Sequence, residues 1–330
     1  MRAVVITRPG GPEVLELRDV PRPRAGYRQV LVRVHAAGLN RADILQRQGR
    51  YPAPNDSPAD IPGLEFAGEV AELGPGAVDW RVGQRVFGLV SGGAFAEYLV
   101  VHGRMLAEIP DTLDWPAAAA VPEAFITAHD ALVAHACLRG SERVLIHAVG
   151  SGVGLSAVQL VRALGAVPYG TSRTAAKIVA AREVGLEDGV VIANGELSVI
   201  AEHAAAWTGG AGVDVVLDLV GGAYVAASLA ALAVKGRHVL ISTLAGAQAE
   251  IPIGTMLRKR LTLRGTVLRS RPLEEKIAAV RAFAREVVPM FSRGIVHPVV
   301  DRTFPLDAIR AAHEYLESNE SVGKVVAGGW

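Results

Sequence analysis

The chain has 330 residues, half of them hydrophobic, and its 34 basic residues nearly balance its 33 acidic ones. A net charge of +1 gives no long-range attraction for polyanions, so nucleic acid is not an expected partner. The only cysteine, Cys137, excludes an intramolecular disulfide and a thiolate-rich metal site. No signal peptide is expected, because the N-terminus lacks an apolar core of about seven residues and a small-residue cleavage site. No membrane span is expected either, because the most apolar stretches are interrupted well before ~20 residues. These properties indicate a cytoplasmic enzyme long enough for two domains.

The first third of the chain is predicted to be rich in β-strands. Its β-branched runs are separated by glycine and proline turns, and the runs are Met1–Ile6, Gln29–Val34, Glu69–Leu73, Arg85–Val90 and Phe95–Val101. Strands at this density, with no long helical period, favour a small barrel or sandwich.

After about Trp115 the pattern changes to an alternation of strands and helices. The predicted strands are Arg143–Val149, Val167–Gly170, Val190–Ile192, Asp214–Leu219, His238–Ser242 and Leu261–Leu263, and the predicted helices are Gly154–Leu164, Thr174–Val184 and Glu196–Trp207. Strands that are apolar on both faces and alternate with helices predict a parallel sheet covered on both sides. A long helix at Leu273–Phe291, a second at Leu306–Glu317 and a strand at Gly323–Val326 are predicted to follow.

The first strand of this alternation leads into a small-residue turn, Ser151-Gly152-Val153-Gly154, and then into a helix. Small residues let the backbone approach a pyrophosphate, whose charge the N–H groups of a helix N-terminus stabilise. The full six-residue glycine fingerprint is absent in the expected register, so an ordinary tight turn is the alternative interpretation. The position of the turn favours a dinucleotide site, and we expect Ser151, Gly152, Val153 and Gly154 to bind the cofactor.

The second strand of the alternation indicates which dinucleotide is bound. Enzymes specific for NAD carry an acidic residue about 20 residues beyond the turn, to hold the ribose hydroxyls. This chain has Ser172 and Arg173 there, with Lys177 one helical turn further. A hydroxyl and two cations suit a 2′-phosphate, which favours NADPH over a merely solvated basic helix start.

Taken together, these features resemble the quinone oxidoreductases of the medium-chain dehydrogenase/reductase superfamily, the group that includes zeta-crystallin. The segments that carry the resemblance are Gly38–Asp43, Gln46–Pro52, Pro62–Gly68, Val121–Ala128, His147–Gly154 and Gly323–Val326. The first two are especially similar to the apoptosis-induced type of animal NADPH quinone oxidoreductase.

The resemblance implies an α/β fold in which a GroES-like β domain is joined to a Rossmann domain with a doubly wound parallel sheet. Residues 1–123 and 267–330 would form the GroES-like catalytic domain, and residues 124–266 the NADPH-binding Rossmann domain. Members of the family commonly dimerise through the last strands of their Rossmann sheets, so a homodimer is expected by analogy.

The resemblance also implies that no metal is bound. Zinc-dependent relatives hold a catalytic zinc with cysteine, histidine and cysteine or aspartate, whereas this chain has Gly38-Leu39-Asn40 and Leu64-Glu65 at those positions. The four-cysteine lobe of such relatives is missing as well.

Candidate site residues follow from the same resemblance. Asn40 and Asp43 match positions near the nicotinamide, although such a pair can equally cap a helix. Tyr51 matches a tyrosine that lines the quinone site, or is simply a buried aromatic beside prolines, and Gln48 would lie nearby. The remaining cofactor contacts expected are Thr127, Thr243, Val267, Leu268 and Arg269. For Lys324 both a cofactor contact and a surface position remain open. Where close relatives often pack a tyrosine on the adenosine, this chain has Asn194 or Gly195.

The sequence therefore predicts NADPH-dependent reduction of a small-molecule quinone by hydride transfer without zinc. A reductase of activated alkenes (enones, enals or enoyl thioesters) would share the cofactor and fold. A non-catalytic NADPH- or RNA-binding protein is the alternative from another class, and the low aromatic content and near-zero net charge disfavour its RNA-binding form.

Overall fold

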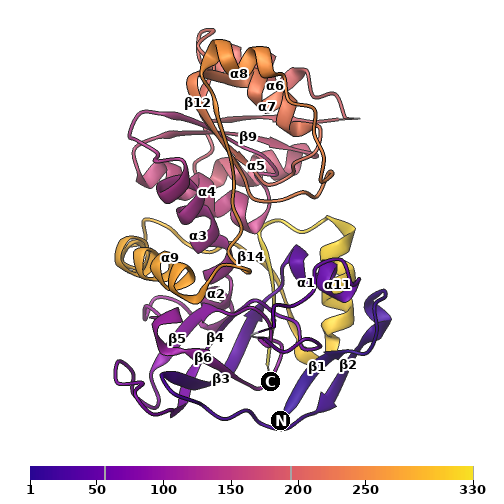
Figure 1. Cartoon of the computed structure of the whole chain (residues 1–330), viewed down its shortest axis with the longest axis vertical. Coiled ribbons are helices and arrows are strands. Elements are labelled where there is room, and N and C mark those ends of the chain that lie inside the picture. Colours follow the sequence, from indigo (N-terminus) through magenta and orange to yellow (C-terminus); the bar gives the residue numbers. More distant parts are fainter. Residues whose placement is uncertain (56, 194, 330) are drawn as a thin grey trace. The chain divides into compact units, whose positions relative to one another are not determined.

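The computed structural model describes residues 1–55, 57–193 and 195–329, so the altered position at Asn194 lies outside the described residues (Figure 1). The chain divides into two compact units. Unit 1 consists of Met1–Ile126 and Leu268–Trp330, and unit 2 of Thr127–Val267. Both chain ends therefore belong to unit 1, and each unit is described by itself below.

Unit 1 contains a seven-stranded sheet with the order β14-β15-β3-β4-β5-β7, in which β6 also pairs with β3, and a separate β1–β2 hairpin. The strands are β1 Arg2–Ile6, β2 Leu15–Asp19, β3 Gln29–Gly38, β4 Glu65–Leu73, β5 Arg85–Leu89, β6 Tyr98–His102, β7 Leu106–Glu108, β14 Val300–Pro305 and β15 Lys324–Gly328. β15 pairs with β3 antiparallel, so the last strand of the chain is joined to the sheet made by its first third.

The helices of unit 1 connect these strands. They are α1 Arg41–Arg47, α2 Trp115–Ala119, α9 Leu273–Glu286, α10 Val288–Ser292 and α11 Ile309–Ser318, with α3 Pro122–His129 crossing the boundary between the units. Short 3₁₀ turns lie at Pro12–Val14, Gly103–Met105 and Leu306–Ala308.

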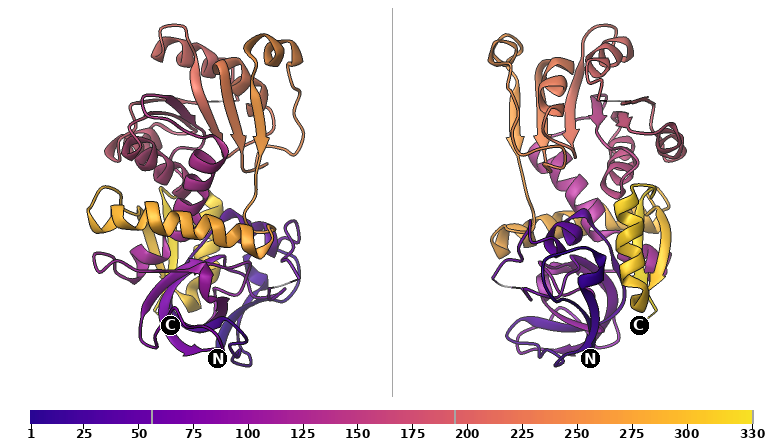
Figure 2. Two further views of the ribbon diagram at one scale, coloured as in Figure 1. Left: turned by 60° about the vertical axis from the view of Figure 1, so that its left-hand side comes forward. Right: turned by 90° about the vertical axis from the view of Figure 1, so that its right-hand side faces the viewer.

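Unit 2 is a six-stranded parallel sheet with the order β10-β9-β8-β11-β12-β13 (Figure 2). Its strands are β8 Arg143–Ile146, β9 Val167–Ser172, β10 Asp188–Val191, β11 Val213–Asp218, β12 Leu232–Leu240 and β13 Thr262–Gly265. Its helices are α4 Gly152–Ala163, α5 Ala175–Glu183, α6 Val199–Trp207, α7 Tyr224–Ala231 and α8 Ile253–Lys259, after a π-helical turn at Asp130–His135. The predicted α/β chain with a parallel sheet is confirmed.

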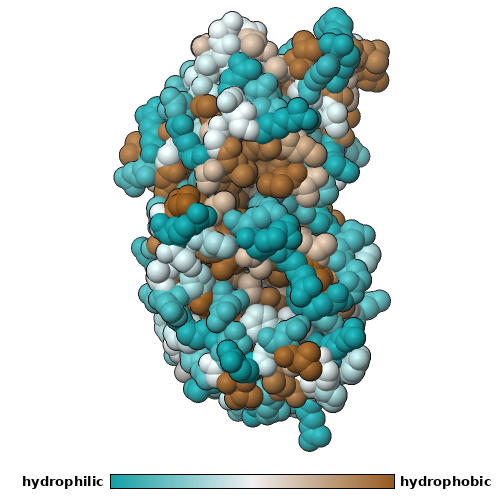
Figure 3. Space-filling model, turned by 90° about the vertical axis from the view of Figure 1, so that its left-hand side faces the viewer, coloured by the Kyte–Doolittle hydropathy of each residue, from teal (hydrophilic) through white to brown (hydrophobic). Residues whose placement is uncertain are grey.

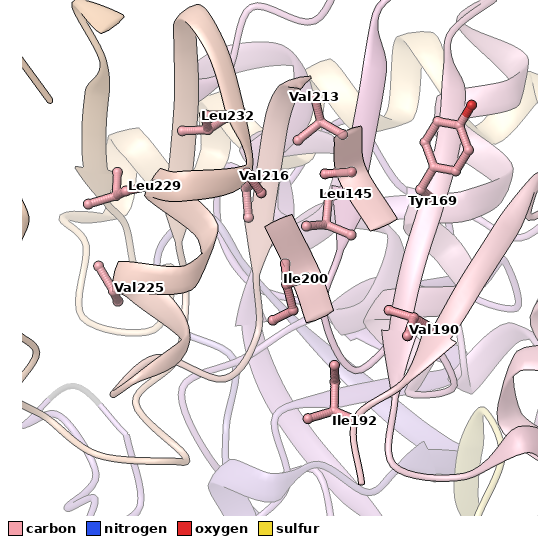
Figure 4. Close-up of a cluster of buried hydrophobic side chains, with 12 residues drawn as sticks. Leu145, Tyr169, Val190, Ile192, Ile200, Val213, Val216, Val225, Leu229 and Leu232 are labelled. Atoms are coloured by element: carbon pink, nitrogen blue, oxygen red, sulfur yellow. The ribbon is translucent and has the colours of Figure 1, made fainter. Parts of the chain in front are cut away.

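The core of unit 2 explains why its strands are apolar on both faces. Leu145 and Val216 point from the central strands toward Ile200 of α6 and Leu229 of α7, and all four are fully buried (Figure 4). The alternate strand residues Val144, Ile146, Val215 and Leu217 are fully buried as well. Because successive side chains of a strand point to opposite faces, both faces of the sheet must be covered.

Some element boundaries differ from the predictions. The helix predicted over Leu273–Phe291 is two helices, which meet at Val287. Pro289 causes the break, because proline lacks the N–H that a continuing helix needs and its ring clashes with the preceding turn. The fifth strand, predicted to begin at His238, begins six positions earlier at Leu232, and the preceding helix α7 was not predicted.

Among the described residues, no helix combines the length and the apolar character needed to cross a membrane. The visible surface in Figure 3 is mostly hydrophilic, with separate apolar patches.

Candidate functional site

The turn after β8 is built for close backbone packing. Ser151 caps α4, because its hydroxyl accepts a hydrogen bond from the Gly154 N–H at 3.1 Å. A Cβ on Gly154 would lie 2.6 Å from the carbonyl oxygen of Val149 and 2.7 Å from that of Ala148, so a larger residue does not fit without a shift. N–H groups at the start of an α-helix stabilise anions, so the pyrophosphate site expected at the first turn of this 12-residue helix stays a prediction.

The basic group predicted after β9 lies beside this turn. The Val149 N–H donates to the Thr171 carbonyl at 2.9 Å, which joins the turn to the end of β9. Ser172 is buried and Arg173 is exposed. The side chain of Lys177 packs against Gly150, where a Cβ would meet it at 2.6 Å. Ser172, Arg173 and Lys177 are thus brought next to the α4 N-terminus, as a 2′-phosphate site requires.

Asp218 ties the loop that contains Thr243 to the same edge of the sheet. This buried carboxylate accepts hydrogen bonds from the N–H groups of Val220 and Gly221 at 2.8 and 2.9 Å, and it pairs with His238 at 3.0 Å. The Ala245 N–H then donates to the Val220 carbonyl at 2.9 Å. Because Thr243 follows a parallel strand, it lies at the carboxyl edge where ligands of such sheets bind.

Thr127 offers a second sign of a ligand in unit 2. Its hydroxyl oxygen is buried, and among the described residues it has no hydrogen-bond partner. Buried polar atoms are normally paired, so this hydroxyl fits a contact with a polar group of a bound cofactor. Val267 ends unit 2, and Leu268 begins the second segment of unit 1.

In unit 1, Asn40 and Asp43 begin helix α1. The Asn40 N–H donates to one oxygen of Asp43 at 2.7 Å, and the Gly63 N–H donates to the other at 3.0 Å. Burial raises the pKa of Asp43 to about 7, against the opposing effect of these hydrogen bonds. The pair therefore forms a helix cap and fixes the loop before β4, while a role near the nicotinamide stays a prediction.

A lysine ammonium lies next to Asn40. Lys324 donates to the Leu39 carbonyl at 2.8 Å, to the Asn40 side-chain oxygen at 2.7 Å and to the Glu65 carboxylate. Glu65 is fully buried and Lys324 is 5% exposed, so this ion pair is desolvated. The second Glu65 oxygen accepts the N–H of Glu123 at 2.7 Å.

This arrangement does not fit a catalytic zinc at the positions where the zinc-dependent relatives hold theirs. Here the ammonium of Lys324, and not a metal ion, supplies the positive charge. It already donates hydrogen bonds to oxygen atoms of Leu39, Asn40 and Glu65. Within the described part of the chain, no group of three or more His, Cys, Asp or Glu residues is arranged to hold a metal.

Arg269 organises the surroundings of Tyr51. Its guanidinium donates to the Ser91 carbonyl at 2.9 Å, to the Tyr51 carbonyl at 3.3 Å and to the Gln46 side-chain oxygen at 2.5 Å. It also lies 4.9 Å from the centre of the Tyr51 ring. The Arg269 side chain, predicted to contact the cofactor, is therefore engaged within unit 1, and only its backbone remains for that role.

Gln48 points elsewhere. Its side-chain amide donates to Glu317 of α11 at 3.3 Å, whereas Gln46 bonds Arg269, which in turn bonds the Tyr51 carbonyl. Sequence reasoning missed Gln46, Glu65 and Glu123 as members of this polar cluster. All three lie within the segments that carry the family resemblance. However, Gln46 bonds Arg269 across 223 residues of sequence, Glu65 bonds Lys324 across 259, and Glu123 joins the cluster through Glu65, 58 residues away.

Comparison with known proteins agrees with this architecture. Residues 26–111 match the alcohol dehydrogenase GroES-like domain, and residues 190–326 match a zinc-binding dehydrogenase family. The chain is 30% identical over 334 residues to a human quinone oxidoreductase, covering 99% of this chain and 97% of that protein. It is also 36% identical over 299 residues to polyketide synthase GfsB of Streptomyces halstedii, covering 90% of this chain but only 5% of that synthase.

Solved structures agree as well. A mycobacterial protein complexed with NADPH is 29% identical, with a TM-score of 0.87 over 100% of both chains. The CurK enoyl reductase is 27% identical, with a TM-score of 0.85 over 99% of this chain and 98% of its own. The GroES-like domain and the Rossmann-type parallel sheet define a medium-chain dehydrogenase/reductase. Within that superfamily, the chain belongs to the zeta-crystallin-like quinone oxidoreductase family.

Proposed function

We propose that this protein is an NADPH-dependent reductase of quinones that works without zinc. The observation that carries the proposal is the Lys324 ammonium, which bonds Asn40 and Glu65 where zinc-dependent relatives hold their metal. Without a Lewis acid, an alcohol is hard to activate for oxidation. A quinone needs less activation, because it accepts a hydride readily and its product anion is delocalised. Positioning in a dry site then supplies most of the catalysis.

NADPH, when bound, supplies the hydride from C4 of its nicotinamide. The N-terminus of α4, with Ser151 to Gly154, would hold the pyrophosphate, and Ser172, Arg173 and Lys177 the 2′-phosphate. The Thr127 hydroxyl, which has no hydrogen-bond partner in the described part of the chain, and the Thr243 loop would orient the nicotinamide end. The backbone of Val267, Leu268 and Arg269 would assist them. The mycobacterial relative complexed with NADPH supports this cofactor.

The substrate residues belong to unit 1. The Tyr51 ring, partly exposed and held from one side by Arg269, offers a flat surface on which a quinone can stack. Asn40, fixed by Lys324 and Glu65, and Asp43 keep the start of α1 rigid. Gln48 could reach the substrate only if its hydrogen bond to Glu317 breaks. Gln46, which bonds Arg269, is therefore the better candidate for a glutamine near the substrate.

The Tyr51 role gives a direct prediction. Replacing Tyr51 with alanine is expected to raise KM for a quinone about tenfold, because an aromatic stack contributes about 0.5–1.5 kcal/mol. Tyr51→Phe keeps the ring and should stay within about threefold of the wild type. Tyr27, whose side chain is 70% exposed, provides the control variant Tyr27→Ala, for which no change in KM is expected. Unchanged KM in Tyr51→Ala would remove the ring from the substrate site.

Reduction of activated alkenes is the second candidate, and the likeness to the CurK enoyl reductase favours it. The experiment that separates the two functions measures kcat/KM for NADPH oxidation with ortho- and para-quinones, an enone and an enoyl thioester. We expect quinones to exceed the other acceptors by at least about tenfold, which is a difference of 1.4 kcal/mol in transition-state stabilisation. Turnover confined to the enone or thioester would establish the alternative. NADPH binding without any turnover would favour a binding role.

We also propose the domain assignment 1–123 with 267–330 and 124–266, and a homodimer formed through β13 at the edge of the parallel sheet. β13 is a terminal strand whose residues are largely accessible, as an edge available for pairing requires. Sedimentation analysis would test the dimer. The cytoplasmic location and the absence of nucleic-acid binding stay predictions of the sequence.

A further inference from the structure

Reduction of a quinone requires a proton as well as a hydride. A hydride delivers two electrons and one hydrogen, which leaves a hydroquinone monoanion. One further O–H bond must form on the negatively charged oxygen of this monoanion before the neutral hydroquinone can leave. The polar cluster of unit 1 contains three carboxyl groups that could supply this proton, those of Asp43, Glu65 and Glu123.

Two of these carboxyl groups, those of Asp43 and Glu65, already accept hydrogen bonds on both of their oxygens. Both oxygens of Asp43 accept backbone N–H groups, from Asn40 and Gly63. One oxygen of Glu65 accepts hydrogen bonds from Lys324 and Asn40, and the other accepts the N–H of Glu123. Because every oxygen of these two carboxyl groups already accepts a hydrogen bond from the protein, neither group has an oxygen left to face a substrate.

Glu123 differs from both. It lies in the first turn of α3, and the residues that follow it, Ala124 and Phe125, are fully or almost fully buried. Its own side chain is partly exposed, and among the described residues no hydrogen bond or ion pair of its carboxyl group is found. The Glu123 carboxyl group is therefore half-buried in unit 1, and its oxygens are available to a ligand.

The charged groups around Glu123 have opposing effects on its pKa. Burial, Glu65 on β4 and Asp43 on α1 raise the pKa of Glu123, whereas Lys324 on β15 and Arg269 lower it. The result is a pKa of about 8, so the carboxyl group is mostly protonated at neutral pH. Burial raises the pKa of the Tyr51 phenol, and Glu123 is near enough to add to this effect, against the opposing effect of Arg269.

We propose that Glu123 is the catalytic acid, which donates its proton to the oxygen of the reduced substrate. This inference rests on the proposed function. The O–H bond of Glu123 breaks, the O–H bond of the hydroquinone forms, and the carboxylate that remains is reprotonated from water. Two electrons pass from NADPH to the quinone, so the reaction needs no further oxidant or reductant.

The test compares kcat/KM of Glu123→Gln and of the wild type over about pH 6 to 10, a range that brackets the Glu123 pKa of about 8. An acid must be protonated to act, so wild-type kcat/KM should be constant below about pH 8 and fall about tenfold per pH unit above it. Glu123→Gln should lower kcat/KM at neutral pH by about 100-fold and lose this decline. Glu123→Asp should keep the decline at a reduced rate. Glu275, an exposed residue of α9, provides the control Glu275→Gln, for which the wild-type profile is expected.

Two further readouts separate the possible outcomes. NADPH binding followed by fluorescence should be unchanged in Glu123→Gln, which shows that the variant is folded. Infrared difference spectra between the wild type and this variant should contain a protonated carboxyl band that disappears at about pH 8. An active wild type together with an equally active Glu123→Gln variant would overturn the inference alone. A wild type that reduces no acceptor would overturn the proposed function, and the absence of the infrared band would overturn the inference independently of activity.

Discussion

Replacing Arg173 with glutamate is expected to lower kcat/KM for NADPH by at least about 100-fold. A charge-assisted hydrogen bond contributes about 1.5–3 kcal/mol, and a carboxylate at this position would also repel the 2′-phosphate. Arg173 is exposed beside the α4 N-terminus, so its replacement should leave the fold unchanged. NADH lacks the 2′-phosphate, and a carboxylate there can hold ribose hydroxyls. For NADH, kcat/KM should therefore stay constant or rise.

A matched control lies on helix α5, which begins two residues after Arg173. Arg182→Glu makes the same change of charge in the last turn of α5, where Arg182 forms an exposed ion pair with Asp188. This variant should retain the NADPH preference of the wild type. Steady-state kinetics with both cofactors at matched concentrations measure the effect. An Arg173→Glu variant that keeps its preference for NADPH would place the 2′-phosphate elsewhere.

The second large effect concerns stability. Lys324→Met is expected to lower the free energy of unfolding by about 3–5 kcal/mol, because it leaves the buried Glu65 carboxylate without its counter-charge. The oxygen of Asn40 and the Leu39 carbonyl lose a donor in the same step. Unfolding in urea, followed by circular dichroism and tryptophan fluorescence, measures the loss.

Two further variants test whether the loss of unfolding free energy in Lys324→Met comes from the buried charge. Glu65→Leu combined with Lys324→Met should be less destabilising than the sum of the two single changes, because the double variant leaves no buried charge of this pair. Arg18→Met breaks the ion pair with Glu16, whose side chains are 52% and 43% exposed, and should cost less than about 1 kcal/mol. A Lys324→Met variant as stable as Arg18→Met would contradict a desolvated ion pair at this position.

Much of unit 2 could be predicted because its signals are local. The β8 strand, the small-residue turn and α4 follow one another within about 20 residues, and each element is specified by its own composition. The start of β12 was not predictable in this way. Lys235 in this strand has a positive φ of 65°, and the strand is irregular between Val213 and Val215 of its partner β11, so the pairing overrides the local pattern.

The site was predicted less completely because it depends on long-range contacts. Gln46 is in α1 and Gln48 is the residue that follows its end, so their side chains point in different directions, and sequence spacing alone does not say which one bonds Arg269. The answer depends on Arg269, which is 223 residues from Gln46 in the sequence. The Lys324–Glu65 pair spans 259 residues, and the interpretation of Lys324 as a surface residue is wrong because the side chain is buried.

The measurement that tests the central claim most directly is NADPH oxidation by a para-quinone after exhaustive dialysis against a chelator. Rates with NADPH and NADH should be compared at matched concentrations, before and after addition of zinc. The account predicts full quinone-dependent turnover in the chelated protein, with NADPH preferred and no stimulation by zinc. Turnover that disappears with the chelator and returns with zinc would contradict it.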